Sequence, residues 1–203
     1  MVRCQGLEPE RNEIVFLDPR QIVGNVNLAK YRQIQEAMGC RNGIILPSNR
    51  DWTCFSKREI QSEDFFISCK MRWVDGVEWE ETAIFQKYLN RIRQGAPAKE
   101  AKTEEALRKR YRRLDRIYES VRKNGFDTST ENLVLVSLDQ GGDLYWGPDG
   151  RHRLAMGILL NVEAMPFCVS LVHQDALDHF QSIRLMSRAH PHSHLSFRRG
   201  SVS

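Results

Sequence analysis

The sequence predicts an α+β fold in which a small mixed sheet packs against helices and is interrupted by a two-helix insertion. Short apolar runs that end in turn residues, such as "EIVFLDP" and "MPFCVSLV", lie toward both ends of the chain and are typical of buried strands. Apolar residues at helical spacing fill the middle of the chain. A further apolar segment, "RHRLAMGILL", predicts a short helix between two of the strands.

The length and composition favour one domain with an insertion. The chain has 203 residues, of which 41% are hydrophobic, and this content is enough for one ordinary core. We expect a single domain over residues 1–185 with a helical insertion at about 77–125. Residues 186–203 show no periodicity, so we expect them to form a disordered tail.

Composition also disfavours several classes of protein. No apolar stretch reaches the roughly 18 residues that cross a bilayer, and the N-terminus lacks the apolar centre of a signal peptide. We therefore expect a cytoplasmic protein without a membrane partner. The five cysteines are odd in number and contain no CxxC pair, which disfavours a disulfide framework or a zinc cluster. A net charge of +4 mildly favours phosphate-bearing partners.

The first third of the chain contains two strands and a helix. Residues 14–17 form an apolar run that stops at Asp18 and Pro19, which predicts a strand entering a turn. A helix is predicted to follow and to end at Gly39, and its apolar residues are Leu28, Tyr31, Ile34 and Met38. The segment "NGIILPSNRDW" then predicts a strand that leaves a turn.

The insertion is predicted to consist of two long helices, over residues 79–95 and 103–125. Thr103 is a suitable N-cap for the second helix, which has one apolar face. Its opposite face carries Arg108, Arg112 and Arg116 together with Lys109, Arg110 and Arg113. This face suits contact with a nucleic-acid backbone, and the alternative interpretation is an ordinary solvated helix exterior.

The C-terminal part alternates strands, turns and helices. Strands are predicted in "NLVLVSL", "DLYW" and "MPFCVSLV", with the helix "RHRLAMGILL" before the last of them. We expect this helix to pack on a sheet that contains residues 133–138 and 165–172. A final helix, "DALDHFQSIRLMSR", is predicted to place Leu177, Phe180, Ile183 and Leu185 on its inner side.

The turn "GPDG" opens directly onto Arg151, His152 and Arg153 at a helix N-terminus. Such an N-terminus attracts anions through its backbone N–H groups and its dipole, and Gly147 and Gly150 allow the backbone to approach a ligand closely. The alternative is a structural turn whose polar neighbours face water. Three cationic side chains beside the positive end of a helix dipole are unfavourable without an anion, which favours a phosphate site.

The motif "DGRHRLAMGILLNVEAMPFCVSLV", with the first strand "EIVFLDPRQI", resembles the ParB/sulfiredoxin superfamily over roughly residues 13–23 and 131–173. Members bind or turn over nucleoside triphosphates, so the resemblance implies that Gly150, His152 and Arg153 contact phosphates. Sulfiredoxins have a catalytic cysteine at the position of Arg151, so their chemistry is not expected. Partition proteins often have a glutamate at the position of Arg151 that assists metal binding, so magnesium binding is left open here. Asp149 either takes the role of that glutamate or only forms the turn.

Two functions from different classes follow. The first is a nucleotide-binding or phosphate-binding protein, for ATP or CTP, with phosphotransferase or nucleotidase activity. Its phosphate site would be Gly150, Arg151, His152 and Arg153, and its candidate catalytic residues would be Asp149 and His152. The second is a non-enzymatic DNA-binding protein that uses the helix at 103–125.

Three weaker candidates stand outside the motif. His173 closes the last strand and is either a member of the same site or a surface residue. Trp52, next to Asp51, is either a base-stacking face or a core residue. His190, His192 and His194 lie in the tail, where a metal site would need further ligands.

Overall fold

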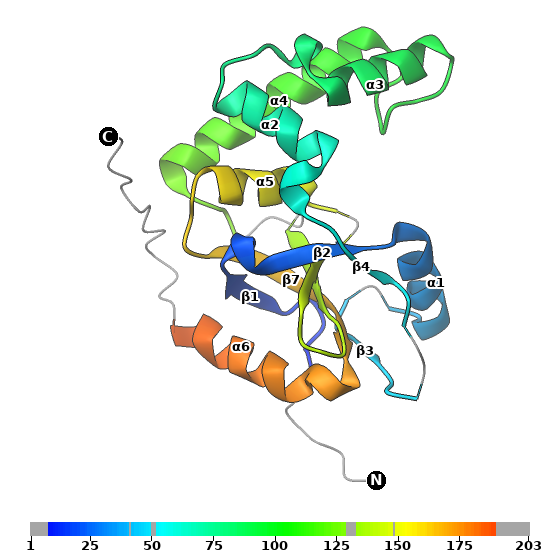
Figure 1. Ribbon diagram of the computed structural model, residues 1–203, viewed down its shortest axis with the longest axis vertical. Coiled ribbons are helices and arrows are strands. Elements are labelled where there is room, and N and C mark those ends of the chain that lie inside the picture. Colours follow the sequence, from blue (N-terminus) through cyan, green and yellow to red (C-terminus); the bar gives the residue numbers. More distant parts are fainter. Residues whose placement is uncertain (1–7, 41, 50–51, 129–132, 148, 190–203) are drawn as a thin grey trace. The chain divides into compact units, whose positions relative to one another are not determined.

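The computed structural model describes residues 8–40, 42–49, 52–128, 133–147 and 149–189 (Figure 1). The chain is a mixed α+β protein, as expected, and divides into two compact units. One unit, here called the sheet unit, comprises Met1–Glu59 and Thr128–Ser203, and the other, the helical unit, comprises Ile60–Asp127. Within the described ranges, none of the helices is long and apolar enough to cross a membrane.

The sheet unit is built on a seven-stranded mixed sheet in the described part of the chain. Its main path runs β1-β7-β5-β6-β2-β4, and β3 joins the same sheet by pairing with β7. The strands are β1 (Ile14–Leu17), β2 (Ile22–Val26), β3 (Ile44–Leu46), β4 (Phe55–Lys57), β5 (Val134–Leu138), β6 (Leu144–Trp146) and β7 (Met165–His173).

Strand β7 organises this sheet. All nine of its residues are buried. Strand β1 pairs with its first half, β3 pairs with its second half, and β5 lies parallel along its other edge. The pairing of β5 with β7 confirms that the two predicted C-terminal strands share one sheet. Strands β5 and β6 form an antiparallel hairpin, and β6 then runs parallel to β2.

Three α-helices pack on the sheet: α1 (Leu28–Met38), α5 (Arg151–Leu159) and α6 (Leu177–Ala189). The predicted stop of α1 is confirmed, since Gly39 adopts a positive φ of 65° at its C-cap. Helix α6 contacts β1 and β7, and its residues Phe180 and Ile183 are buried. The expectation for Leu185 was wrong: it is 65% exposed, because it lies two positions beyond Ile183 and so faces away from the sheet.

The disordered tail that was expected over residues 186–203 was placed too early, because α6 continues to Ala189. Residues 190–203 lie outside the described residues.

The helical unit contains three α-helices in the described chain: the two that were predicted within residues 77–125, and one before them that the sequence did not indicate. They are α2 (Asp64–Trp73), α3 (Ala83–Arg93) and α4 (Glu104–Asn124), with the 3-10 turns η2 (Ile60–Ser62) and η3 (Trp79–Glu81). Helix α3 begins four residues later than predicted, because Thr82 caps it by accepting a hydrogen bond from the Phe85 amide. The start of α4 is as predicted, with Thr103 accepting from the Ala106 amide.

A polar centre inside the helical unit joins α2, η3 and α4. One oxygen of Asp115 accepts from the indole N–H groups of Trp73 and Trp79, at 3.0 and 2.8 Å. Its other oxygen accepts from Arg72 at 3.1 Å, and Arg72 also pairs with Glu78 at 2.9 Å. The Asp115 carboxylate therefore accepts from donors of two other elements, α2 and η3, which lie 36 to 43 residues before it in the sequence.

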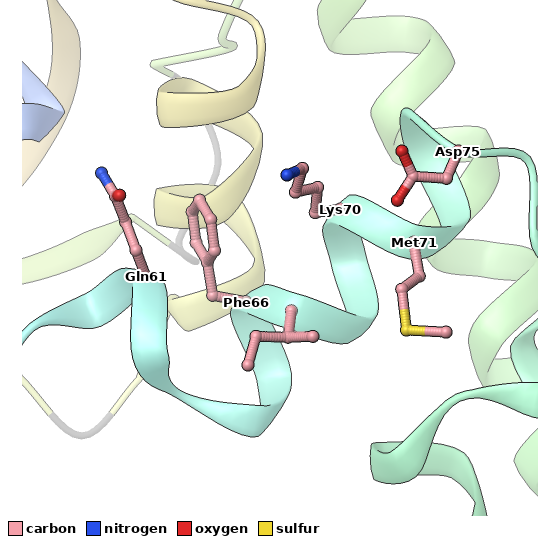
Figure 2. Close-up of a pocket in the computed structure, with 6 residues that line it drawn as sticks. Gln61, Phe66, Lys70, Met71 and Asp75 are labelled. Carbon is pink, nitrogen blue, oxygen red and sulfur yellow. The ribbon is translucent and has the colours of Figure 1, made fainter.

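Helix α2 also lines a pocket of about 320 Å³ in the helical unit (Figure 2). Its lining comprises Gln61, Phe66, Ile67, Lys70, Met71 and Asp75. The lysine and the aspartate are both exposed there. None of the residues that the sequence singled out for function lines this pocket.

Candidate functional site

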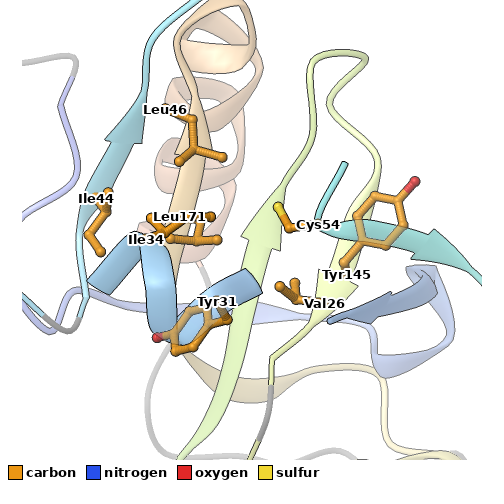
Figure 3. Packing of buried hydrophobic residues seen from close by; sticks show 8 residues of the cluster. All are labelled: Val26, Tyr31, Ile34, Ile44, Leu46, Cys54, Tyr145 and Leu171. Carbon is orange, nitrogen blue, oxygen red and sulfur yellow. The ribbon is translucent and has the colours of Figure 1, made fainter. Parts of the chain in front are cut away.

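Strand β6, which leads into the Gly-Pro-Asp-Gly turn, is fixed by a hydrophobic cluster. Tyr145 of β6 packs with Val26, Cys54 and Leu171, and Figure 3 shows these side chains together with Tyr31 of α1. The remaining buried members of the cluster are Ile34, Ile44 and Leu46. Apolar packing therefore fixes β6 on the face of the sheet that α1 covers.

The hairpin before β6 adds a second restraint. The Tyr145 hydroxyl donates to Asp139 Oδ2 at 2.9 Å, and Asp139 Oδ1 accepts from the amides of Gly141 and Asp143. Burial and this hydrogen bond raise the pKa of Tyr145, so the phenol stays protonated at neutral pH. The aspartate thus closes the β5–β6 turn and sets the direction of β6.

Both glycines of the turn lie against β5. The Gly147 amide donates to the Leu135 carbonyl at 2.7 Å, and a Cβ at this position would lie 2.7 Å from Leu135 Cβ. Gly150 has φ 87°, and its Cβ would lie 2.6 Å from Val134 Cα. Glycine is therefore required at position 150 for two reasons, conformation and space. Pro148 lies outside the described residues.

Helix α5 begins without a side-chain cap. Gly150 is its N-cap and provides no acceptor for the first-turn amides, whereas Asn27, Thr82 and Thr103 provide one at α1, α3 and α4. Arg151, His152 and Arg153 occupy this first turn and are half-buried, and Asp149 just before it is exposed. The structure therefore brings the five candidate residues of the motif together at one helix N-terminus.

The other end of α5 is anchored in the core. Leu154, Ala155 and Met156 are fully buried. Gly157 lies so close to its neighbours that an added Cβ would be 2.5 Å from Met165 Sδ and 3.2 Å from Pro19 Cγ. The position of the first turn relative to the sheet is consequently fixed by packing, as expected for a preformed site.

Asn25 lies on the same face of the sheet as the start of α5, although the sequence did not single it out. It pairs with Trp146 in the parallel β2–β6 register, and Trp146 pairs in turn with Val136 of β5. Paired residues share a face of a sheet, and Val136 shares its face with Val134, on which Gly150 packs. The Asn25 Oδ1 atom is buried and has no hydrogen-bond partner among the described residues. A buried acceptor of this kind is uncommon and calls for a partner.

His173 does not belong to this site. It is the last residue of β7 and pairs with Leu46, whereas Gly150 packs on Val134 at the beginning of the parallel strand β5. The two positions therefore lie at opposite ends of the sheet. His173 is also buried, not a surface residue, and its Nδ1 accepts from the Asp175 amide at 3.2 Å.

Trp52 packs on the hydrophobic cluster and donates from its indole to the Pro47 carbonyl at 2.9 Å, which favours the core interpretation. Its neighbour Asp51 lies outside the described residues, as do His190, His192 and His194. No group of three or more His, Cys, Asp or Glu side chains in the described ranges is placed to hold a metal ion.

The three arginines proposed for DNA contact differ in their surroundings. Arg108 is engaged inside the helical unit, where it pairs with Glu80 at 2.9 Å and with Glu104 at 2.6 Å. These carboxylates raise the pKa of Arg108, chiefly through the hydrogen bond to Glu80. Arg112 and Arg116 are exposed. The expectation of a largely solvated set therefore holds for two of the three.

No protein-family model, curated protein or solved structure matches the chain. Its function is therefore inferred from the arrangement of its own residues.

Proposed function

We propose that the protein binds a phosphate-bearing ligand, a nucleoside triphosphate such as ATP or CTP, at the first turn of α5. The observation that carries this proposal is the N-cap Gly150, which is held on Val134 with φ 87° and leaves the helix without a side-chain cap. A phosphate oxygen is the natural acceptor for amides at such a helix N-terminus.

The charges at this turn support an anion and not merely a neutral acceptor. Arg151 and Arg153 place two permanent cations beside the positive end of the helix dipole, where each costs a few tenths of a kcal/mol or more by itself. A bound phosphate reverses the sign of that interaction. Arginine also offers paired donors that match phosphate oxygens.

Asn25 supports a ligand that is larger than inorganic phosphate. Its buried Oδ1 lies on the same face of the sheet as the start of α5 and lacks a partner among the described residues. A hydroxyl or amino group of a nucleoside would supply the missing donor.

The order of elements is compatible with the ParB/sulfiredoxin superfamily. A glycine turn follows β6, α5 starts at the Arg-His-Arg sequence, and β7 returns parallel to β5 in a mixed sheet. We propose this fold family for the sheet unit, with the helical unit as its insertion.

The chemistry that this site would perform is transfer of the terminal phosphoryl group to water or to another hydroxyl. The oxygen of the acceptor would bond to phosphorus while the bond to the bridging oxygen breaks, and the two arginines would offset the charge on the phosphoryl oxygens. His152 or Asp149 would accept the proton that the attacking oxygen loses. Magnesium would be carried by the phosphates, with Asp149 as its candidate carboxylate.

The proposal is tested by isothermal titration of ATP, CTP and inorganic phosphate, each with and without magnesium. We expect Arg153→Ala to weaken nucleotide binding by about 10- to 150-fold, because it removes a charge-assisted contact worth about 1.5–3 kcal/mol. Arg32→Ala on α1 is the matched control, since Arg32 is an exposed arginine of the same unit. This control should bind as the wild type does.

Two results would contradict the proposal. One is a wild-type protein that binds none of the three ligands and gains no thermal stability from them, although a ligand at a hundred times its dissociation constant should add about 2.7 kcal/mol. The other is an equal loss of affinity in Arg153→Ala and Arg32→Ala, which would show that only net charge matters.

A further inference from the structure

Helix α4 carries a stripe of four cations, here called the α4 stripe, made of Lys109, Arg112, Arg113 and Arg116. These residues follow the spacing i, i+3, i+4, i+7, which places them on one face of a helix. All four are exposed. None of them makes a hydrogen bond or an ion pair with another residue that the structure describes.

Two other cations of α4 are neutralised locally. Arg108 lies between Glu80 and Glu104, and Arg122 pairs with Glu119 at 2.6 Å. Arg110 and Lys123 of α4 also lack an ion pair among the described residues, but the stripe gathers four unpaired cations within eight residues on one face. Like charges at i, i+4 repel each other, so the arrangement is unfavourable in isolation and becomes favourable beside a polyanion.

We propose that the α4 stripe binds the phosphate backbone of duplex DNA. At a rise of about 1.5 Å per residue, the four cations cover about 10 Å of helix axis, or about one cation per 3 Å. One DNA strand presents a phosphate about every 3.4 Å along its axis. The two charge densities match, and an exposed helix is accommodated by the wide major groove of B-form DNA, whereas the groove of duplex RNA is deep and narrow.

The surroundings of the stripe disfavour a membrane surface as the partner. Helices that lie on a bilayer insert a free apolar face into it. The apolar face of α4 is already used inside the helical unit, where Leu107, Tyr111, Tyr118 and Val121 are buried. The exposed large hydrophobic residues of the described chain all lie outside α4.

Binding through the stripe would be independent of base sequence. The stripe contains only lysine and arginine, and contacts from these residues to phosphates carry no sequence information. The stripe belongs to the helical unit and the first turn of α5 to the sheet unit, and they share no residue, so either proposal can fail without the other.

The test is fluorescence anisotropy with two duplexes of about 20 base pairs and unrelated sequence, over a range of salt concentrations. At physiological salt the wild type should bind both with a dissociation constant of order 10⁻⁶–10⁻⁴ M and more tightly at 50 mM, and the slope of log K against log salt should be about −3.6 for four contacts. The triple variant Arg112→Gln/Arg113→Gln/Arg116→Gln should bind roughly a thousand-fold more weakly and show a slope near −0.9.

A second variant with the same net charge separates the stripe from general electrostatics. Arg91, Lys99 and Lys102 are exposed cations of the same unit. The control is Arg91→Gln/Lys99→Asn/Lys102→Gln, where asparagine suits the positive φ of 59° at position 99. It should bind DNA within about threefold of the wild type, as should Arg153→Ala, in the α5 turn.

Circular dichroism shows whether the triple variant is folded. If it is not, the single change Arg116→Gln replaces it and should reduce the salt slope by about 0.9. Equal losses in the stripe and control variants would overturn the proposal. So would the absence of binding at 50 mM salt, or tighter binding to duplex RNA or to anionic vesicles than to DNA.

Discussion

Arg184 of α6 holds Glu13 in a two-point ion pair across most of the length of the chain. Arg184 Nε donates to Glu13 Oε1 at 2.5 Å, and Nη2 donates to Oε2 at 2.6 Å. Both side chains are almost buried, at 9% and 12% exposure. Nη2 also donates to the Glu8 carbonyl at 2.7 Å. The ion pair therefore joins α6 to the segment that precedes β1.

Glu13→Gln should make the sheet unit less stable in a way that depends on pH. Burial raises the pKa of Glu13, but hydrogen bonds from Arg184 and from the Glu10 amide, with the charge of Arg184, outweigh it and leave the pKa below its ordinary value of 4.5. The ionised pair therefore stabilises the fold above that value and loses its effect as the pH falls through the lower, folded-state pKa. At pH 7 we expect a loss of about 3 kcal/mol, measured by urea unfolding.

Lowering the pH should narrow the difference in unfolding free energy between Glu13→Gln and the wild type, because both proteins then carry a neutral side chain at position 13. Asp143→Asn is the control, since Asp143 pairs with Lys57 on the surface and its loss should cost much less. A pH-independent difference between Glu13→Gln and the wild type would rule out the ion pair as its cause.

Asp115→Ala should destabilise the helical unit by about 3 kcal/mol, because the indole N–H groups of Trp73 and Trp79 and the Arg72 guanidinium lose their common acceptor. Asp115→Asn keeps one oxygen as an acceptor for the indoles and should lose less. The near-ultraviolet circular dichroism should change as well, because Trp73 stacks on Tyr118 at a ring distance of 4.7 Å. Unchanged stability in Asp115→Ala would show that water replaces the carboxylate at no cost.

Elements with a strong local pattern were predictable from the sequence, and those that depend on distant partners were not. Helix α4 is amphipathic over 21 residues and has a threonine cap, so its bounds could be predicted. Helix α2 was missed because its apolar residues Phe65, Phe66 and Ile67 are consecutive, which is not a helical spacing. Strand β4 is short and largely polar, and it becomes a strand only by pairing with β2.

The candidate site follows the same division. The turn and the Arg-His-Arg sequence are contiguous, so they could be found by inspection. Asn25 lies about 120 residues earlier, and only the parallel pairing of β2 with β6 places it on the same face of the sheet as the start of α5. Arg108 looked like its neighbours on α4, and only the fold shows that Glu80 of η3 engages it. Pairings between distant segments depend on tertiary structure, which a local pattern does not contain.

The buried cysteines should resist alkylation in the native protein. Burial raises the pKa of the Cys54 thiol to about 11, and it also raises the pKa of Cys168. Since the thiolate is the reactive form, iodoacetamide at about pH 8 should leave Cys54, Cys69 and Cys168 unmodified, whereas the half-buried Cys40 should react. Peptide mapping by mass spectrometry measures each site separately, and unfolding in urea should make all four reactive. Rapid native labelling of Cys54 would contradict the packing of the cluster in Figure 3.

Gly150→Ala tests whether the turn before α5 is held as tightly as its contacts indicate. An alanine there must adopt φ 87° and place its Cβ 2.6 Å from Val134 Cα, which is backbone and cannot rotate away. Gly39 has a similar φ of 65° in the same unit, but an added Cβ would meet nothing within 4 Å. Gly39→Ala should therefore cost about 1 kcal/mol for conformation alone, whereas Gly150→Ala should cost about 3 kcal/mol because overpacking is added.

Urea unfolding of both glycine variants measures this difference, and ligand titration on the folded fraction shows its consequence for the site. If the Gly150→Ala backbone relieves the clash by moving away from β5, the first turn of α5 moves with it, and nucleotide affinity should fall although no charged group has been removed. Gly39→Ala should keep the wild-type affinity, because an added Cβ at position 39 meets nothing within 4 Å and so does not displace the first turn of α5. Equal unfolding free energies for the two variants would mean that the turn can shift without cost, and a preformed phosphate site at α5 would then lose its structural basis.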